Sequence, residues 1–337
     1  MMKNYKVLIA TVMGLLVSSC ITLAWSGHDV FTFLVATSIP GFDYQRVVEI
    51  RQYTYLEKRA YNEEMYVTED LILTGKARIN IDEDLIRESG IRFLPNRVVQ
   101  DGKLPVWAIF LVYACFPDNG MDFVEQSEIL RSLIGDTQAN RHGYLKISFF
   151  EYLEGDKSFL HFLKMSKEAF KNGDEYWGYR FLAYALHYLE DLMQPYHVRP
   201  GTVPELIRFI FDKKTRIFLR NAHSTYDVYM TFLLHSSKYR EEFRQMIRDA
   251  KPLILPVSDE QLIYEAIMYS YSAFFDIHAE VKKVFGQILY ERKATIQDFK
   301  RAEEKGELDR LYELTKKLAS TLASLAKGVI LKTVPSN

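Results

Sequence analysis

Cysteine is nearly absent from this chain of 337 residues. Only Cys20 and Cys115 occur, and Cys20 lies in an apolar N-terminal run, so a chain cut after that run could form no internal disulfide. Cys115 stands in an apolar stretch, which is typical of a small buried side chain. Stability must therefore come from an apolar core or from bound metal rather than from disulfide bonds.

The chain also lacks an excess of charge of either sign, because 43 Lys and Arg balance 44 Asp and Glu and leave a net charge of −1. No strongly basic block occurs, and this argues against a partner such as duplex DNA. Hydrophobic residues make up 48% of the chain, which excludes extended disorder as its main state. Internal repeats and low-complexity tracts are absent as well.

Sustained alternation of apolar and polar residues, the pattern of half-buried strands, is almost missing. Apolar residues instead recur at steps of three and four, so the predicted fold class is all-α. The expected helices cover residues 27–39, 105–116, 158–194 with a break at 171–174, about 203–220, 223–247 and 259–288, and a last segment with Leu311, Leu314, Leu318, Leu322 and Leu325. Pro195 is expected to end the long helix.

The N-terminus has the composition of a secretory signal. Two lysines precede an apolar run from Val7 to Ala24, and Thr22-Leu-Ala24 fits a small-x-small cleavage site. Cleavage there would make Trp25 the mature N-terminus and export the protein to the periplasm, the cell surface or the medium. Two alternatives stay open, namely a lipoprotein signal with lipid anchoring at Cys20, and an uncleaved membrane anchor.

Three regions are expected along the chain. Residues 1–24 form the signal peptide, residues 25–290 a helical metal-dependent hydrolase domain, and residues 291–337 a C-terminal amphipathic helical segment. Within the domain, residues 42–105 mix charges with Val, Ile and Tyr and read as an insertion. The C-terminal helix has a polar face of mixed charge, which favours a docked core helix or a coiled-coil face over a membrane-surface helix.

Histidine and aspartate recur in a pattern suited to metal binding. His187 and Asp191 are four residues apart, as are His223 and Asp227 at the expected start of another helix, and this spacing places both side chains on one helix face. His197 follows a proline that turns the chain back toward the first pair. Imidazole and carboxylate ligands together favour zinc, with manganese or iron as alternatives. Histidine is scarce, yet the residues His161, His235 and His278 remain outside this pattern.

Residues 187–197 read HYLEDLMQPYH and residues 223–227 read HSTYD. Together they resemble the bacterial zinc-dependent phospholipases C and the related fungal zinc-dependent single-strand nucleases, which share a helical fold with three zinc ions. In that family a Trp at the mature N-terminus binds zinc through its amino group and carbonyl oxygen. The sequence WSGH at residues 25–28, directly after the expected cleavage site, looks like that N-terminus.

The resemblance implies three groups of ligands for up to three zinc ions. These groups are Trp25, His28 and Asp191; His197, His223 and Asp227; and Asp118, His142 and His187. Asp191 would bridge two metals, and Asp118 is also a candidate general base. Asp122 or Asp136 could replace Asp118. Glu190 departs from the family, which usually has Gly there, and its side chain is expected either to point outward or to crowd the site.

The expected function is zinc-dependent hydrolysis of phosphate esters, because clustered divalent ions bind a phosphate through its oxygens and lower the pKa of a nearby water. A phospholipase C-type phosphodiesterase is the leading prediction, with a phospholipid substrate and contact with a membrane surface. Tyr226 favours it. Asp227 favours the alternative, a single-strand nuclease or nucleotidase acting on single-stranded nucleic acid. A non-catalytic zinc-stabilised binding protein is the third alternative.

Overall fold

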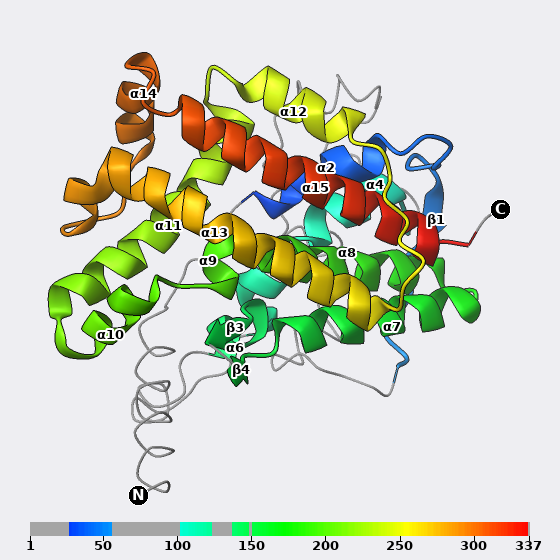
Figure 1. The fold of residues 1–337 in the computed structure, drawn as a ribbon. Helices are drawn as coiled ribbons and strands as arrows, with labels where there is room; N and C mark the ends of the chain where they lie inside the picture. Colours follow the sequence, from blue (N-terminus) through cyan, green and yellow to red (C-terminus); the bar gives the residue numbers. More distant parts are fainter. Residues whose placement is uncertain (1–26, 56–101, 123–136, 148–149, 336–337) are drawn as a thin grey trace, which may run out of the picture.

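A computed structural model describes residues 27–55, 102–122, 137–147 and 150–335 (Figure 1). The protein is mostly helical and of the all-α class, as predicted. The expected signal peptide, Trp25, Cys20 and Asp136 lie outside the described residues, as does most of the expected insertion. Among the helices that are described, none is both long and apolar enough to cross a membrane.

The described elements follow one another in a simple order. They are α2 (His28–Thr37), β1 (Val47–Glu49), β2 (Lys103–Pro105), α4 (Val106–Tyr113), the π-helical turn η3 (Pro117–Met121), α6 (Thr137–His142), β3 (Leu145–Ile147), β4 (Phe150–Tyr152), α7 (Gly155–Lys171), α8 (Glu175–Leu192), α9 (Pro195–Val198), α10 (Val203–Phe211), α11 (Lys213–His235), α12 (Arg240–Asp249), α13 (Asp259–Leu289), α14 (Ile296–Glu304) and α15 (Asp309–Thr333).

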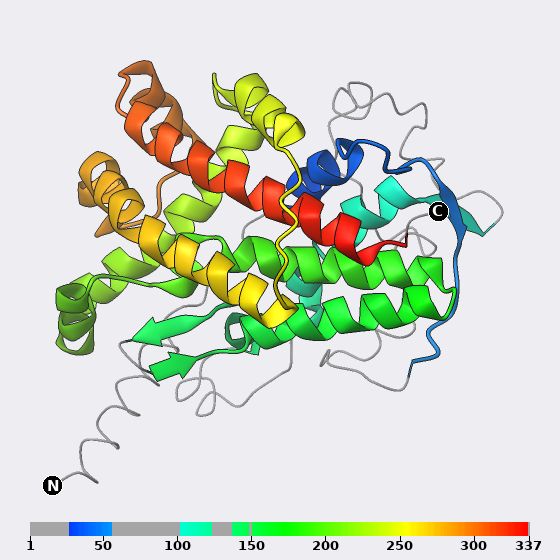
Figure 2. The ribbon, with the colours of Figure 1, turned by 45° about the vertical axis from the view of Figure 1, so that its right-hand side comes forward.

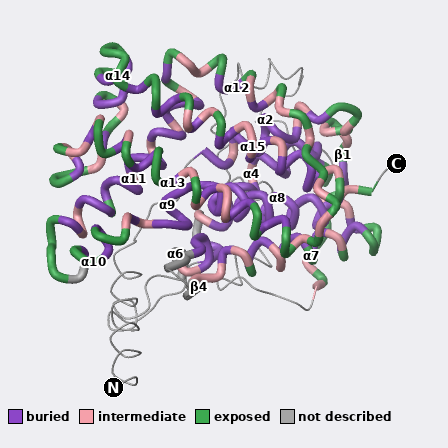
Figure 3. The backbone as a smooth tube through the Cα atoms, viewed as in Figure 1, coloured by how far each residue is buried: buried purple, intermediate pink, exposed green. Residues whose placement is uncertain are grey.

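Helices α7 and α8 form an antiparallel hairpin in which α8 runs through the middle of the molecule (Figures 1 and 2). The break predicted between them is confirmed, because Gly173 adopts a φ of +72° that favours glycine. The side chain of Asp174 then accepts a hydrogen bond from the Trp177 amide and caps α8. Helix α8 is buried from Tyr176 to Leu192, so polar residues on it lie in the interior (Figure 3).

The C-terminal helix packs onto this hairpin. In Figure 1, α13 and α15 run side by side across the front, and α15 also contacts α12, α2 and α8. Leu311, Leu318, Leu322 and Leu325 of α15 are buried. The expectation of a docked core helix is therefore confirmed. The face of α15 that docks is the leucine face that was predicted from apolar residues three and four positions apart.

Several predicted helix boundaries are wrong. The expected helix 223–247 is interrupted at residues 236–239, which separate α11 from α12. The chain breaks at Asp212, whose side chain accepts hydrogen bonds from the amides of Lys214 and Thr215 and so caps α11. The expected helix 203–220 is therefore divided between α10 and α11, and His223 lies in the middle of α11 rather than at a helix start. Helix α8 ends at Leu192, while Pro195 is the first residue of the short helix α9.

The described strands form two short antiparallel pairs. Strand β1 pairs with β2 so that Val48 lies opposite Leu104, which brings the two ends of the expected insertion 42–105 together. Strand β3 pairs with β4 beside the metal-ligand candidate His142 at the end of α6. These strand pairs were not predicted, because strands of three residues are too short to show a period of two.

Candidate metal centre

Five helices and the π-helical turn η3 bring eight of the nine expected ligand residues into the interior. His28 is the first residue of α2, Asp118 lies on η3, and His142 ends α6. His187 and Asp191 project from α8, His197 from α9, and His223 and Asp227 from α11. The ninth expected ligand, Trp25, lies outside the described residues.

The tightest group joins Asp118, His142, His187 and Asp191. Nδ1 of His142 lies 3.0 Å from Nε2 of His187, and Oδ2 of Asp191 lies 2.7 and 3.1 Å from these two atoms. Oδ1 of Asp118 lies 3.4 and 3.6 Å from the same two nitrogens. Ligand atoms of a tetrahedral zinc site are about 3.3 Å apart, since each is about 2.0 to 2.1 Å from the metal. The four atoms therefore have the spacing of such a site.

A second group joins His197 of α9 to His223 and Asp227 of α11. One ligand atom of each residue lies within 4.8 Å of the other two. Nε2 of His223 is 3.4 Å from Oδ2 of Asp227, and Nε2 of His197 is 3.8 Å from Oδ1 of the same carboxylate. This group is wider than the first and would hold a metal with three protein ligands, which leaves room for a further ligand.

The carboxylate of Asp191 joins the groups. Its Oδ2 faces His142 and His187, whereas its Oδ1 lies 3.2 Å from Nδ1 of His197 and 3.5 Å from Nε2 of His28. His28, His187 and Asp191 form a third set whose ligand atoms lie within 4.8 Å of one another. A carboxylate whose two oxygens face different sets of nitrogens has the geometry of a bridging ligand.

Several polar atoms at this centre are buried but have no hydrogen-bond partner among the described residues. They are Oδ1 of Asp191, both ring nitrogens of His197, Nε2 of His223 and Oδ2 of Asp227. Leaving a buried polar atom unsatisfied costs about 1–3 kcal/mol, and such atoms are rare in folded proteins. Bound cations would satisfy the two carboxylate oxygens, Nε2 of His223 and one ring nitrogen of His197, so the residues fit a metal centre.

The remaining ring nitrogens of the histidines are held by neighbours. Nδ1 of His187 lies 2.7 Å from the carbonyl oxygen of Ala114, and Nε2 of His142 lies 3.2 Å from Oδ2 of Asp122. Asp122 in turn accepts from Arg141 and from the hydroxyl of Tyr188. Such contacts fix ring orientation in metal sites. Asp122, an alternative to Asp118, lies on the ring edge of His142 that faces away from the first group.

Glu190 and Gln194 have roles that the sequence did not show. Glu190 points neither outward nor into the first group, because its carboxylate lies 2.6 Å from Nδ1 of His28. Gln194 donates from Nε2 to Oδ1 of Asp227 at 2.5 Å and so orients that carboxylate. Gln194 was visible in the motif at residues 187–197, but its partner is 33 residues away and no spacing indicates it.

The acids and bases at the centre have strongly shifted pKa values. Burial alone would raise the pKa of Asp191, but the charges of His197 and His187 hold it well below its usual value. Burial would lower the pKa of His142, yet its hydrogen bonds to Asp122 and Asp191 raise it to about 10. Burial lowers the pKa of His187, and the charge of His28 adds to this effect.

In the second group, burial outweighs the effect of neighbouring charges on the pKa values of Asp227 and His223. Burial raises the pKa of Asp227 to about 7, although the charge of His197 opposes this. Burial, reinforced by His197, lowers the pKa of His223 well below its usual value. At neutral pH the His223 imidazole is therefore neutral, which is the form that binds a metal.

Asp118 is the most accessible ligand candidate, with 16% of its side chain exposed, while the other seven described candidates are exposed by 6% or less. The π-helical turn that carries it is a kind of distortion found often at functional sites. A solute would therefore reach the first group from the side of Asp118.

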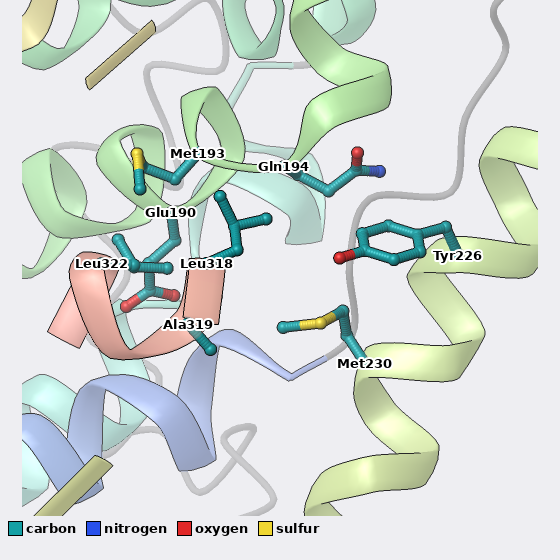
Figure 4. Close-up of a pocket in the computed structure, with 8 residues that line it drawn as sticks. All are labelled: Glu190, Met193, Gln194, Tyr226, Met230, Leu318, Ala319 and Leu322. Atoms are coloured by element: carbon teal, nitrogen blue, oxygen red, sulfur yellow. The ribbon is translucent and has the colours of Figure 1, made fainter. Parts of the chain in front are cut away.

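A small apolar cavity lies between α8, α11 and α15, behind the metal-ligand candidates (Figure 4). Met193, Tyr226, Met230 and Leu318 contribute to its wall together with Glu190. Its volume is about 10 Å³, which is no more than a single water molecule needs. This cavity is a packing space and is too small to hold a substrate.

The histidines left out of the expected pattern stay outside these groups. His161 and His235 are only partly buried. His278 is buried, with Nε2 3.0 Å from Glu205 and Nδ1 3.0 Å from the hydroxyl of Tyr196. The Tyr196 ring stacks on His223, so His278 lies behind the second group without belonging to it.

A scan against protein-family models finds no match for the chain, and a search of curated proteins finds none either. What is established is the arrangement itself, namely buried groups of His and Asp that could hold metal ions.

Proposed function

We propose that the protein is a zinc-dependent hydrolase of phosphate esters with up to three zinc ions, related to the zinc-dependent phospholipases C and single-strand nucleases. One observation carries this proposal: the two oxygens of Asp191 face two different sets of imidazole nitrogens. Imidazole and carboxylate donors at these spacings suit zinc. A structural site needs only one closed shell of four ligands, whereas here Asp191 also links that shell to a second group with three protein ligands and room for a further one, which favours catalysis.

Bound divalent ions would neutralise the charge that develops on a phosphate and lower the pKa of an attacking water. The residues of the chain orient the reactants and exclude solvent. Asp118 is the candidate general base, because its carboxylate borders two groups and is partly open to solvent. Oδ1 of Asp118 faces His142 and Oδ2 faces His28. Either oxygen could therefore accept a proton from a water molecule that lies between these two histidines.

A phospholipid is the substrate that the outer surface supports best. Val203, Ile207 and Phe211 follow one face of α10 and are 56%, 57% and 83% exposed. Exposed basic residues adjoin this stripe along the chain, and these are Arg208 of α10 and Lys213 and Lys214 at the start of α11. Apolar side chains beside cations match a bilayer surface with anionic headgroups. Helix α10 lies directly between His197 of α9 and His223 of α11 along the chain.

Tyr226 no longer separates the candidate substrates. The residue is fully buried, and its hydroxyl lies 3.2 Å from Oγ1 of Thr315 on α15. Tyr226 therefore contributes to packing and does not contact a lipid headgroup. Asp227 completes the second group as an Asp, which is the feature that keeps a single-strand nuclease or nucleotidase as the second candidate.

The test combines metal analysis with hydrolysis of two substrates. Purified protein is expected to contain two or three zinc ions and to release phosphorylated headgroup from phosphatidylcholine vesicles but little nucleotide from single-stranded DNA. The reverse preference would support the nuclease. Bound metal without turnover of either substrate would support the binding protein, and less than one zinc per chain would contradict all three functions. N-terminal sequencing of exported protein tests whether the chain begins at Trp25, at Cys20 or at Met1.

A further inference from the structure

The carboxylate of Glu190 joins the central helix α8 to helix α2. Its Oε2 lies 2.6 Å from Nδ1 of His28, and its Oε1 accepts a hydrogen bond of 2.6 Å from the hydroxyl of Thr32. His28 and Thr32 are one turn apart on α2, so one carboxylate holds two positions of the same helix face. All three side chains are buried, with exposures of 0 or 1%.

This contact determines which nitrogen of His28 is available. A His28 imidazole that binds a metal through Nε2 has its one ring proton on Nδ1, where the carboxylate of Glu190 accepts it as a hydrogen bond. Nε2 is also the atom that faces the metal-ligand candidates, 3.5 Å from Oδ1 of Asp191 and 3.8 Å from Oδ2 of Asp118. The carbonyl of Ala114 holds His187 in the same way through its Nδ1.

Helix packing alone does not account for a carboxylate at position 190. A buried carboxylate is costly unless positive charge compensates it, and an uncharged side chain could join α2 and α8 without that cost. Among the described residues, no Lys or Arg forms an ion pair with Glu190, whereas the comparable buried Glu205 pairs with Lys282 at 2.9 Å. Within the described part of the chain, the positive charge beside Glu190 can therefore come only from His28 and from whatever His28 binds.

We propose that Glu190 is a positioning residue for the metal held by His28 and Asp191, where it fixes the His28 tautomer and strengthens His28 as a ligand. This inference rests on the metal centre of the proposed function. Residues 190 and 191 adjoin on α8, and successive helix positions differ by about 100°. Asp191 therefore faces the ligand groups while Glu190 faces the back of a ligand from α2. Contacts of this kind typically contribute 10- to 100-fold to metal affinity.

The test measures metal dissociation constants by chelator competition in wild type and in Glu190→Gln. The glutamine keeps the size of the side chain but removes its charge, and one metal is expected to bind roughly 10- to 100-fold more weakly. Glu205→Gln is the matched control, because it removes a buried carboxylate 3.0 Å from His278, a histidine outside the ligand groups. This control is expected to keep the wild-type constants for every metal.

The visible spectrum of the Co²⁺-loaded protein and the metal affinity of a double variant distinguish a positioning role of Glu190 from a role in packing alone. In the Co²⁺-loaded protein, E190Q is expected to alter the visible bands of one site, whereas E205Q leaves the spectrum unchanged. If Glu190 acts through His28, the variant H28Q/E190Q binds metal as H28Q does, because the second change has nothing left to act on. Additive losses in the double variant would overturn the inference.

The outcomes separate the two proposals. Wild type without bound metal would overturn the proposed function and this inference with it. Wild type that binds metal, with E190Q constants within twofold of it, would overturn the inference alone. Should E190Q fail to fold, Glu190→Asp keeps the charge but withdraws it from His28, and an intermediate loss of affinity is expected. Wild-type affinity in that variant would also overturn the inference.

Discussion

Nδ1 of His142 and Nε2 of His187 lie 3.0 Å apart within the first ligand group. Each nitrogen also lies within 3.1 Å of Oδ2 of Asp191. Only one hydrogen can lie between the two imidazole nitrogens. Because both nitrogens also approach the same carboxylate oxygen, at least two of these three atoms point lone pairs at each other. A cation shared by all three residues removes that conflict.

Replacing Asp191 should remove more metal than replacing any other ligand, because its two oxygens face different groups. Asp191→Ala is expected to lose at least two ions and to reduce hydrolysis by about 1,000-fold or more, as expected when several kcal/mol of charge stabilisation are lost. Metal content by mass spectrometry and turnover of a soluble phosphodiester measure the two effects. Asp249→Ala, at the solvent-facing end of α12, is the control. A D191A protein with full metal content would contradict the bridging role.

Metal binding should release protons at pH 7. Hydrogen bonds to Asp122 and Asp191 raise the pKa of His142 to about 10, and those to Asp191 and Glu190 likewise raise the pKa of His28 despite its burial. Both imidazoles are therefore protonated in the metal-free protein at pH 7 and must lose a proton to bind metal.

Calorimetric titration with zinc in buffers of different ionisation enthalpy measures this release. We expect at least two protons per chain at pH 7, because Asp227, with a pKa of about 7, adds to the two imidazoles; fewer protons are expected as pH rises toward 10, and weaker binding as pH falls. The sign follows from the raised pKa values, since a proton competes with the metal below each of them. Binding heats that do not depend on the buffer would contradict the prediction.

A contact remote from the site tests the packing of α15. A Cβ atom at Gly328 would lie 2.0 Å from the carbonyl oxygen of Leu253, in a segment whose amide donates to the carbonyl of Ser324. Gly328→Ala should therefore lower the free energy of unfolding by about 2–3 kcal/mol through overpacking. Gly286→Ala, within α13 and 3.8 Å from its nearest neighbour, should raise it by about 0.5–1 kcal/mol. Urea denaturation compares the two, and equal effects would contradict this arrangement.

Local spacing predicted the pairs His187–Asp191 and His223–Asp227, because residues four apart on a helix share a face whatever surrounds them. The position of Asp118 beside His142 depends on how η3 and α6 pack against α8, and it was expected only from the family resemblance. The partner of Glu190 on α2 is 162 residues away, so no sequence pattern could indicate that contact. Helix ends were misplaced where a single cap such as Asp212 outweighed a continuous apolar pattern.

The stripe on α10 should bind anionic vesicles. Replacing Ile207 and Phe211 by Ser removes apolar area that would enter the interface, and a loss of about 1.5 kcal/mol or more corresponds to at least about tenfold weaker partitioning. Flotation with vesicles of phosphatidylcholine and phosphatidylglycerol measures it. Hydrolysis of a soluble short-chain substrate should remain at the wild-type rate, because neither residue belongs to a ligand group.

Ile254→Ser is the matched control, since Ile254 is 56% exposed and Ile207 57%, but Ile254 lies in the segment between α12 and α13. It should bind vesicles as wild type does. Lys213→Glu with Lys214→Glu should weaken binding to anionic vesicles by about 1 kcal/mol for each lysine and leave binding to neutral vesicles unchanged. If the α10 variant and the control partition alike, the stripe does not contact the bilayer, and the surface then gives no preference for phospholipid over single-stranded nucleic acid.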